Sequence, residues 1–378
     1  MQPIQRPALE LAQVVHRHAQ RLGGLSGQEQ RILRAIVSCR TAALGGHVQR
    51  CDHCQHRRIA YNSCRNRHCP KCQGCACAKW MADRAKELLP VEYFHVVFTL
   101  PDTFNSLALS NKRVIYNVLF DAVAQTLLEV AANPRHLGAR IGFLCILHTW
   151  GQNLTLHPHL HCVIPGGGLS PDGTWIACRK GFFLPVRILS RVFRGKFIDR
   201  LKHAWIAGEL KGLENDRDFA RLIDASVQHD WVVYAKPPFG GPEQVLKYLS
   251  RYTHRIAISN QRMVAMNDNR VSFRWKDYKH HDRPRTMTLD GAEFLRRFLM
   301  HAVPRGFMRI RHFGLLANRV RAGNLATCRR LLAAPIRLIL LATPWLPVCP
   351  VCQRGHLIAG PNLSPSQLSL LILRLDSS

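Results

Sequence analysis

The sequence predicts a mixed α/β fold (α+β class) in which a central sheet is flanked by helices and preceded by a small helical, zinc-binding domain. Short β-branched and aromatic runs, such as residues 93–100 and 156–165, alternate with longer segments whose apolar residues recur at helical spacing, such as 103–132 and 187–210. Two Cys-x-x-Cys pairs precede the first of these strands. The length allows about two or three domains.

The charge of the chain indicates a polyanionic partner. Lys and Arg number 53 against 24 Asp and Glu, a formal net charge of +29, and Lys and Arg that neutralise phosphates release counterions. A merely basic soluble protein is disfavoured, because its self-repulsion would be uncompensated. We see no amino-terminal export signal and no run of about 18 uninterrupted apolar residues, so we expect a cytoplasmic protein with no membrane partner.

Helices are expected over residues 8–21 and 26–40. The second begins with Ser26-Gly27-Gln28-Glu29, a capping-box pattern. Between the two helices and the first strand, the pairs Cys51/Cys54 and Cys69/Cys72 are separated by fourteen residues, close to the spacing of structural zinc ribbons. The spacing predicts one structural Zn²⁺ site, in which Cys64 can replace a cysteine or join a second site.

A third pair, Cys349 and Cys352, is half a zinc site. It predicts partners elsewhere in the chain or simply a tight turn. Arg65, Arg67 and Lys71 lie between the zinc-ligand candidates, and we expect them to contact DNA, although a solvated basic face is an equally good interpretation. The residues after Gly360 are predicted to form a flexible tail.

The strand at 156–165 carries His157, His159 and His161 at alternate positions. Alternate side chains of a strand point to the same face, so His159 and His161 present two nitrogen donors at a fixed separation, half of a divalent-metal site. A lone histidine on an apolar strand is usually a core residue, but three in a strongly basic chain favour a metal. Gln152 and His157 are both candidates for the third ligand.

Two tyrosines four residues apart, Tyr248 and Tyr252, lie in a segment predicted to be helical from 242 to 252. Both hydroxyls would then lie on one helix face. Such aromatic faces normally pack in a core, but the flanking Arg251 and Arg255 favour an anionic substrate. A metal beside paired phenols indicates phosphodiester chemistry. Residues 304–319, which include Arg311 and Arg319, interleave arginines with aromatics, a composition suited to single-stranded DNA.

Several runs together resemble the two-tyrosine HUH rolling-circle transposases of the insertion-sequence ninety-one type, which carry an N-terminal transposase zinc-binding domain. The runs are YNSCRNRHCPKC (61–72), TWGQN (149–153), HPHLH (157–161), YLSRYTHR (248–255) and RHFGLLANR (311–319). The resemblance implies an HUH-endonuclease-type central antiparallel sheet, His159 and His161 as the HUH pair, and Tyr248 and Tyr252 as nucleophiles. It also implies Mg²⁺ or Mn²⁺ during cleavage, whereas imidazole ligands alone favour zinc, manganese or another transition metal.

The implied activity is nicking and rejoining of single-stranded DNA at insertion-sequence ends, through 5′-phosphotyrosine intermediates, by a bacterial, nucleoid-associated enzyme. The implied partners are single-stranded DNA and end hairpins, and the oligomeric state is not predicted. We expect a helical and zinc-binding domain at 1–90, the HUH nuclease domain at 91–320 and a C-terminal region at 321–378. Two alternatives are a plasmid relaxase or rolling-circle replication initiator, and a non-catalytic zinc-dependent nucleic-acid binding protein.

Overall fold

The computed structural model describes residues 7–236, 244–245, 248, 256–277, 283–333 and 346–376. The chain forms two compact units, each assembled from separate stretches of sequence. The cysteine unit contains Met1–Ala78, His254–Leu299 and Ile339–Ser378, and the sheet unit contains Lys79–Thr253 and Met300–Leu338. The three domains expected from the sequence stay a prediction.

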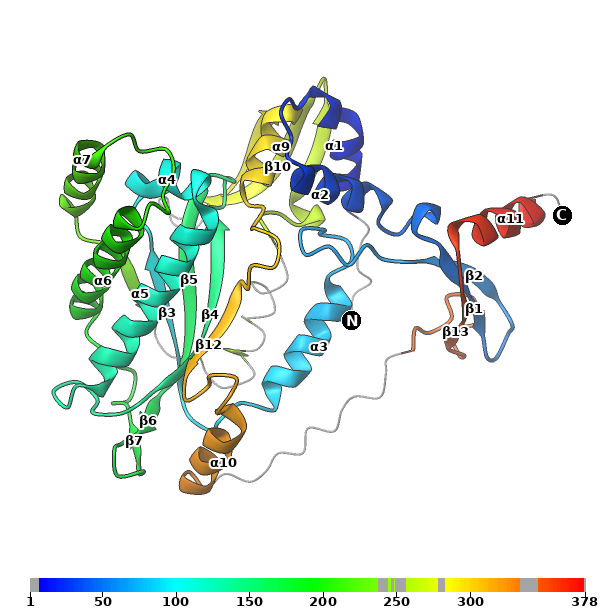
Figure 1. Ribbon diagram of the computed structural model, residues 1–378. Coiled ribbons are helices and arrows are strands. Elements are labelled where there is room, and N and C mark those ends of the chain that lie inside the picture. The colour runs from blue at the N-terminus through cyan, green and yellow to red at the C-terminus, as the bar shows by residue number, and fades with distance from the viewer. Residues whose placement is uncertain are drawn as a thin grey trace. The chain divides into compact units, whose positions relative to one another are not determined.

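The sheet unit is built on a five-stranded antiparallel sheet in the order β12-β4-β5-β3-β8 (Figure 1). This confirms the predicted sheet flanked by helices. β4 and β5 form a hairpin, and β3 and β12 add to its two sides. The strands are β3 (Tyr93–Thr99), β4 (Gly142–Trp150), β5 (Leu156–Pro165), β8 (Val233–Lys236) and β12 (Ile310–Gly314).

One face of this sheet packs against two long helices, α5 (Lys112–Ala132) and α6 (Val186–Ile206), which lie side by side on it in Figure 1. Alternate residues of β3, Phe94, Val96 and Phe98, enter this core, as period-two alternation requires. Among the described residues α5 is the one helix long and apolar enough to cross a membrane, but 67% of its most apolar window is buried inside the protein, as in the core helix of a globular domain.

The opposite face of the sheet carries the intervening residues of the same strands. Leu144, Ile146 and Val163 pack there with Val245. The histidines of β3, β4 and β5 share this face, so the alternation that builds the core also gathers the imidazoles.

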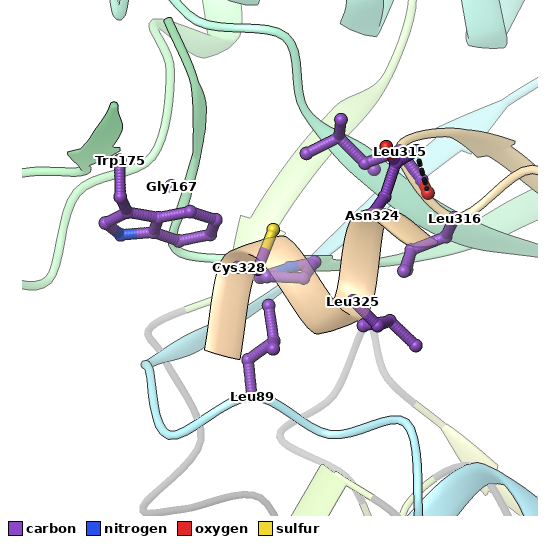
Figure 2. A pocket seen from close by; sticks show the side chains of 10 residues that line it. Leu89, Gly167, Trp175, Leu315, Leu316, Asn324, Leu325 and Cys328 are labelled. Carbon is purple, nitrogen blue, oxygen red and sulfur yellow. Dashed lines mark hydrogen bonds between the residues drawn. The ribbon is translucent and has the colours of Figure 1, made fainter. Parts of the chain in front are cut away.

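Shorter elements surround the sheet. They are α3 (Gly74–Ala85), α4 (Asn105–Ser110), α7 (Asp216–Val227), α10 (Arg321–Leu331) and the hairpin of β6 (Gly167–Leu169) with β7 (Trp175–Ala177). Leu325 and Cys328 of α10 pack near Leu89 and Trp175 around an apolar cavity of about 10 Å³ (Figure 2). That volume is about one water molecule, so the cavity is a packing gap.

The cysteine unit contains two three-stranded sheets, β13-β1-β2 and β11-β10-β9. Ser26 and Glu29 form the predicted capping box at the start of α2. The strands are β1 (Gly46–Cys51), β2 (Arg57–Tyr61), β9 (Met263–Asn267), β10 (Arg270–Asp277), β11 (Arg283–Asp290) and β13 (Leu357–Leu363). The helices are α1 (Leu11–His18), α2 (Gly27–Ser38), α9 (Gly291–Met300) and α11 (Pro365–Asp376).

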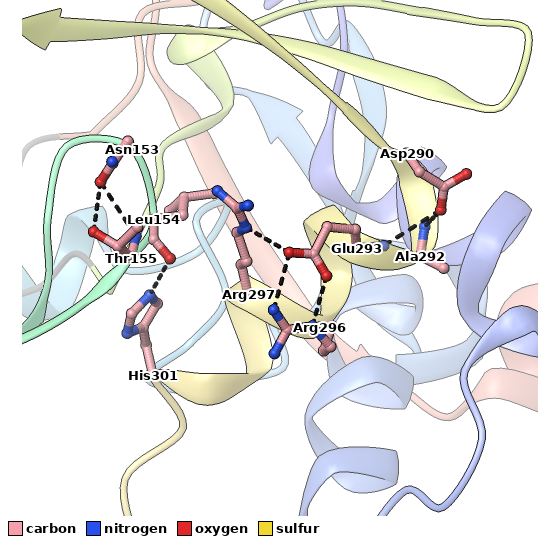
Figure 3. A network of polar contacts seen from close by, with 9 residues as sticks. All are labelled: Asn153, Leu154, Thr155, Asp290, Ala292, Glu293, Arg296, Arg297 and His301. Carbon is pink, nitrogen blue, oxygen red and sulfur yellow. Dashed lines mark hydrogen bonds and ion pairs between the residues drawn. The ribbon is translucent and has the colours of Figure 1, made fainter. Parts of the chain in front are cut away.

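At the start of α9 the Asp290 carboxylate accepts the Ala292 N–H, and Glu293 pairs with Arg296 and Arg297 one turn later (Figure 3). These contacts satisfy an exposed amide at the helix start and add i,i+3 and i,i+4 ion pairs.

One segment differs from expectation. The residues predicted to be a flexible tail form β13 and α11, because β13 pairs with β1.

Candidate active site and cysteine clusters

Three histidines meet on the face of the β4–β5 hairpin that is opposite to α5 and α6. His148 and His159 are directly opposed across the two strands, and His161 lies two residues further along β5. Nε2 of His159 is 3.0 Å from Nε2 of His161, and one ring nitrogen from each of the three residues lies within 4.8 Å of the others. The His148 ring stacks on Trp150 with centroids 4.4 Å apart. The hairpin therefore presents three imidazoles to one point.

Two of these imidazoles, His159 and His161, are held neutral. Burial lowers the pKa of His159 to about 3, and burial also holds the pKa of His161 well below its ordinary value. The His159 Nδ1–H donates to the His157 carbonyl at 2.6 Å, which leaves the Nε2 lone pair directed into the cluster. Neutral imidazoles with converging lone pairs are suited to a divalent metal.

Sequence reasoning missed His148. It named Gln152 and His157 for the third position, but the His157 ring faces Asp102, with Nδ1 3.9 Å from Oδ1, and lies outside the three-histidine group. Gln152 lies in the loop after β4 and stays a prediction. The sequence does show a histidine, His148, in an otherwise apolar strand. It indicates a metal ligand only once β4 is known to pair with β5, because the pairing places His148 opposite His159.

Tyr248 reaches the same face through a fourth histidine, His95 of β3. The Tyr248 hydroxyl lies 3.3 Å from His95 Nε2, and that nitrogen is 2.8 Å from Nδ1 of His161. The His95 side chain is buried, and burial lowers its pKa to about 3. Lys236 Nζ lies 5.9 Å from the centre of the Tyr248 ring. A phenol, a cation and the imidazole cluster thus occupy one part of the sheet, whereas Tyr252, Arg251 and Arg255 lie outside the described residues.

Hydrogen bonds hold the turn of the loop between β4 and β5. Leu154 has a φ of 64°, and the Asn153 side chain accepts hydrogen bonds from the Thr155 amide and hydroxyl. The His301 Nε2–H donates to the Leu154 carbonyl at 3.2 Å (Figure 3), and the Thr149 hydroxyl contacts His301 Nδ1. Both ring nitrogens are used by the neutral form of His301, which positions the hairpin that carries His148 and His159.

His301 gives the first testable prediction. Its burial lowers its pKa from 6.5 to about 4, so between these values the unfolded chain binds a proton that the folded chain does not. The stability contribution is full above pH 6.5 and is lost as the pH falls towards 4, by up to about 2 kcal/mol at pH 5. Urea unfolding at pH 7 and pH 5 should show a smaller loss in His301→Gln than in the wild type. The exposed His229→Gln serves as control, and an equal loss in the wild type and His301→Gln would contradict the prediction.

Eight of the cysteines form two clusters of four. One contains Cys39, Cys64, Cys69 and Cys72, and the other contains Cys51, Cys54, Cys349 and Cys352; in each, the four sulfurs lie within 4.8 Å of one another. The sequence predicted one site made of Cys51, Cys54, Cys69 and Cys72, but the structure places the first pair and the second pair in different clusters. The reason is the β1–β2 hairpin, which holds Cys51 and Cys54 at its turn and leads to Cys39 and Cys64 at its open end. A five-residue strand spans about 17 Å, too far for one ion.

The first cluster fits Zn²⁺. Sγ of Cys64 is 3.6 Å from Sγ of Cys72, and the Asn66 N–H donates to Cys64. A hydrogen bond from the Cys64 thiol lowers the pKa of Cys39, and the same partnership raises the pKa of Cys64. The sulfurs compete for protons, and four sulfurs at this spacing are the usual ligand set of structural zinc. Sequence reasoning missed Cys39, which ends α2.

Of the residues expected to contact DNA, some are exposed and others contact protein side chains. Arg65, Arg67 and Arg319 are exposed. Lys71 is paired with Glu10 at 2.8 Å. The guanidinium of Arg311 lies 4.2 Å from the Phe120 ring centre and donates to Asn117 at 2.6 Å, so Arg311 packs the edge of the sheet.

Two family models match the chain. One, described as "Transposase zinc-binding domain", matches residues 11–100, and the other, described as "Putative transposase", matches residues 142–323. The first range includes the Cys39 cluster, and the second includes His148, His159, His161 and Tyr248.

Among known proteins, the chain is 54% identical to "Putative transposase y4qJ" of Sinorhizobium fredii, over 88% of this chain and 89% of the relative. It is 29% identical to the transposase for insertion sequence element IS801 of Pseudomonas savastanoi pv. phaseolicola, over 85% of this chain and 77% of the relative. A solved structure of the conjugative relaxase TrwC with oriT DNA in a metal-bound state is 15% identical to the chain. The match covers 65% of this chain and 73% of the relaxase chain, with a TM-score of 0.26.

The extent and identity of these matches confirm the resemblance found in the sequence. The chain belongs to the rolling-circle transposases of the insertion-sequence ninety-one type that carry an N-terminal transposase zinc-binding domain.

Proposed function

We propose that this transposase nicks and rejoins single-stranded DNA at the ends of an insertion sequence through a 5′-phosphotyrosine link at Tyr248. The observation that carries the proposal is the hydrogen-bonded connection from the Tyr248 hydroxyl to His95 and from His95 to His161. A nucleophile held beside converging neutral imidazoles is the arrangement that metal-assisted phosphoryl transfer needs.

His148, His159 and His161 would hold the catalytic ion, which we propose to be Mg²⁺ or Mn²⁺. Their nitrogens converge within 4.8 Å, and burial keeps His159 and His161 neutral. A divalent ion bound there would polarise the scissile phosphate and stabilise the charge that develops on it.

In the proposed reaction the Tyr248 oxygen attacks phosphorus and gives its proton to water. The bond from phosphorus to the 3′ oxygen breaks, its electron pair goes to that oxygen, and the oxygen takes a proton from water and leaves as a 3′ hydroxyl. The 5′ phosphate remains on Tyr248. Because a phenol of pKa about 10 is a better leaving group than an alcohol, a 3′ hydroxyl can reverse the step, and strand transfer needs no ATP.

Tyr252 is proposed as the second nucleophile, so that one tyrosine holds the first cut end while the other makes the second cut. Arg251 and Arg255 are proposed to contact the phosphates on either side. These three roles rest on the sequence resemblance.

His95 is proposed to position both Tyr248 and His161. If His161 held the metal through Nε2, its Nδ1 would carry the proton and could donate to His95 Nε2 at 2.8 Å, and the Tyr248 hydroxyl lies 3.3 Å from the same nitrogen. Loss of such a partner typically costs about 10- to 100-fold in metal affinity or activity.

His95→Ala should therefore slow cleavage about 10- to 100-fold and raise the Mn²⁺ concentration needed for half-maximal rate. His95→Gln, which keeps a hydrogen-bonding group, should recover part of the loss. The measurement is the single-turnover cleavage rate across a Mn²⁺ titration. A rate and a Mn²⁺ dependence unchanged in His95→Ala would remove His95 from the site.

The cysteine unit is proposed to recognise the ends of the insertion sequence. The Cys39 cluster would hold a structural Zn²⁺, which stiffens a loop whose Arg65 and Arg67 are exposed. We propose that its DNA partner is the hairpins at the insertion-sequence ends. We also propose that the protein acts in the bacterial cytoplasm, at the nucleoid. No observation favours the plasmid relaxase or replication-initiator alternative.

The proposed function is tested with single-stranded and duplex oligonucleotides from the element ends, each incubated with Mn²⁺ and resolved on a denaturing gel. We expect cleavage and a covalent adduct with the single strand, little with the duplex, and none with EDTA. Tight binding without any cleavage would support the non-catalytic nucleic-acid binding alternative.

A further inference from the structure

We propose that Cys51, Cys54, Cys349 and Cys352 form a second structural zinc site, separate from the Cys39 cluster, which fastens the C-terminal segment to the β1–β2 hairpin. Cys349 and Cys352 lie outside both ranges matched by the family models, 11–100 and 142–323. The inference goes beyond the proposed function and does not depend on the nicking chemistry.

The four sulfurs have the spacing of a tetrathiolate site. Sγ of Cys51 is 3.7 Å from Sγ of Cys352, and Sγ of Cys54 is 3.7 Å from Sγ of Cys349. All four cysteines are free thiols, and a disulfide would require sulfurs about 2.05 Å apart. Sulfurs about 2.3 Å from a shared ion are separated by about 3.7 Å in a tetrahedron, which is the spacing found here.

The two Cys-x-x-Cys turns have similar local geometry. The Cys51 N–H donates to the His56 carbonyl five residues on, and the Cys349 N–H donates to the Gly355 carbonyl six residues on, each at 2.8 Å. The residue after the second cysteine is left-handed in both turns, with φ of 62° at Gln55 and 58° at Gln353. A non-glycine residue is strained in this region, so its presence at both matching positions indicates a common constraint.

Backbone amides point at the sulfurs. The Cys54 N–H donates to Cys51 Sγ, and the Gly355 N–H donates to Cys352 Sγ, each at 3.4 Å. Such donors stabilise thiolate over thiol, and the thiolate is the form that binds metal.

Gly355 allows the two turns to approach. A Cβ at this position would lie 2.6 Å from Cys51 Sγ and 2.5 Å from Asp52 Oδ1. Asp52 in turn accepts the His356 N–H at 2.7 Å. Any side chain at 355 would therefore push the C-terminal turn away from the N-terminal one.

The apolar core of this region is too small to hold it. The cluster of buried residues contains Cys51, Cys349 and Leu357, with Cys352 packed against it, and β13 is mostly exposed beyond Leu357. β13 nevertheless pairs with β1 along most of its length. Small modules of this kind take their stability from the metal, because the free energy of zinc binding becomes folding free energy.

Zinc content tests the proposal directly. The purified full-length protein should contain two Zn²⁺ per chain, released by a mercurial reagent and measured with a chromogenic chelator. Cys349→Ser/Cys352→Ser should retain one Zn²⁺, and Cys64→Ser/Cys72→Ser should retain the other. One Zn²⁺ in the wild type, or two in the Cys349→Ser/Cys352→Ser variant, would overturn the proposal.

Two further measurements keep the test decisive if a serine variant does not fold. In the wild type, Cys349 and Cys352 should resist alkylation until a chelator is added, and the amides of β13 should lose hydrogen-exchange protection at the same step. Gly355→Ala, which keeps every ligand, should weaken zinc retention at this site alone, whereas Gln353→Gly should preserve it. Rapid alkylation in zinc-loaded protein, or recovery of these cysteines as disulfides, would refute the site.

Discussion

Replacing Tyr248 with phenylalanine is expected to lower the rate of the first DNA cleavage by about 10⁴-fold or more, because it removes the attacking oxygen and leaves the ring in place. The ring packs beside His95, with centroids 4.7 Å apart, so the phenyl group should keep the local packing. The measurement is single-turnover cleavage of a labelled single strand in Mn²⁺, resolved on a denaturing gel.

Tyr252→Phe is the matched comparison. If the two tyrosines act in turn, Tyr252→Phe should leave one cleavage intact and block completion of strand transfer. Binding of the single strand should be the same in both variants and the wild type. Cleavage by Tyr248→Phe at the wild-type rate would show that Tyr248 is a packing residue.

Replacing His148 with alanine is expected to reduce cleavage by about 10²- to 10³-fold at fixed Mn²⁺, because a metal ligand supplies several kcal/mol of transition-state stabilisation. His148 lies directly opposite His159 and shares one cluster with His159 and His161. Higher Mn²⁺ should recover part of the rate if binding is the defect. Isothermal titration with Mn²⁺ in the absence of DNA would measure the affinity separately.

His157→Ala and Gln152→Ala are the controls that separate the candidate ligands. We expect both to retain cleavage within about tenfold of the wild type, since His157 lies outside the three-histidine group and Gln152 lies in the loop after β4. Full activity in His148→Ala together with loss in Gln152→Ala would move the third ligand to the loop after β4.

The histidine pair was accessible from the sequence because its signal is local. His159 and His161 are two residues apart on one strand, and strand periodicity alone puts them on one face. His95 and His148 belong to other strands, and His95 is 66 residues from its partner His161. Nothing local tells which strands pair, so the neighbours of the pair emerge only from the sheet order β4-β5-β3.

The cysteines show the same limit more sharply. Spacing correctly picked out the Cys-x-x-Cys turns, but it joined the nearest two, Cys51/Cys54 and Cys69/Cys72. The β1–β2 hairpin separates these two turns in space. The turn of Cys51 and Cys54 lies instead beside Cys349, which is 295 residues from Cys54 in the sequence. Local spacing has no information on contacts of that range.

Arg311 shows a different limit of the sequence pattern. Arginines interleaved with aromatics predicted a DNA surface; residues 310–314 form the edge strand β12, and Arg311 stacks on Phe120, so its contact with DNA stays a prediction. The same composition serves base stacking and internal packing, and only the position relative to α5 distinguishes them.

Covalent capture followed by peptide mapping tests most directly whether the phenol and the imidazole cluster form one active site. The wild-type protein is incubated with a single strand from the element end in Mn²⁺, digested with trypsin, and the nucleotide-bearing peptide is sequenced by mass spectrometry. We predict a 5′ phosphate on Tyr248 or Tyr252, absent with EDTA and strongly reduced in His148→Ala. A nucleotide on a residue elsewhere, or an adduct that forms equally in His148→Ala and with EDTA, would contradict the account.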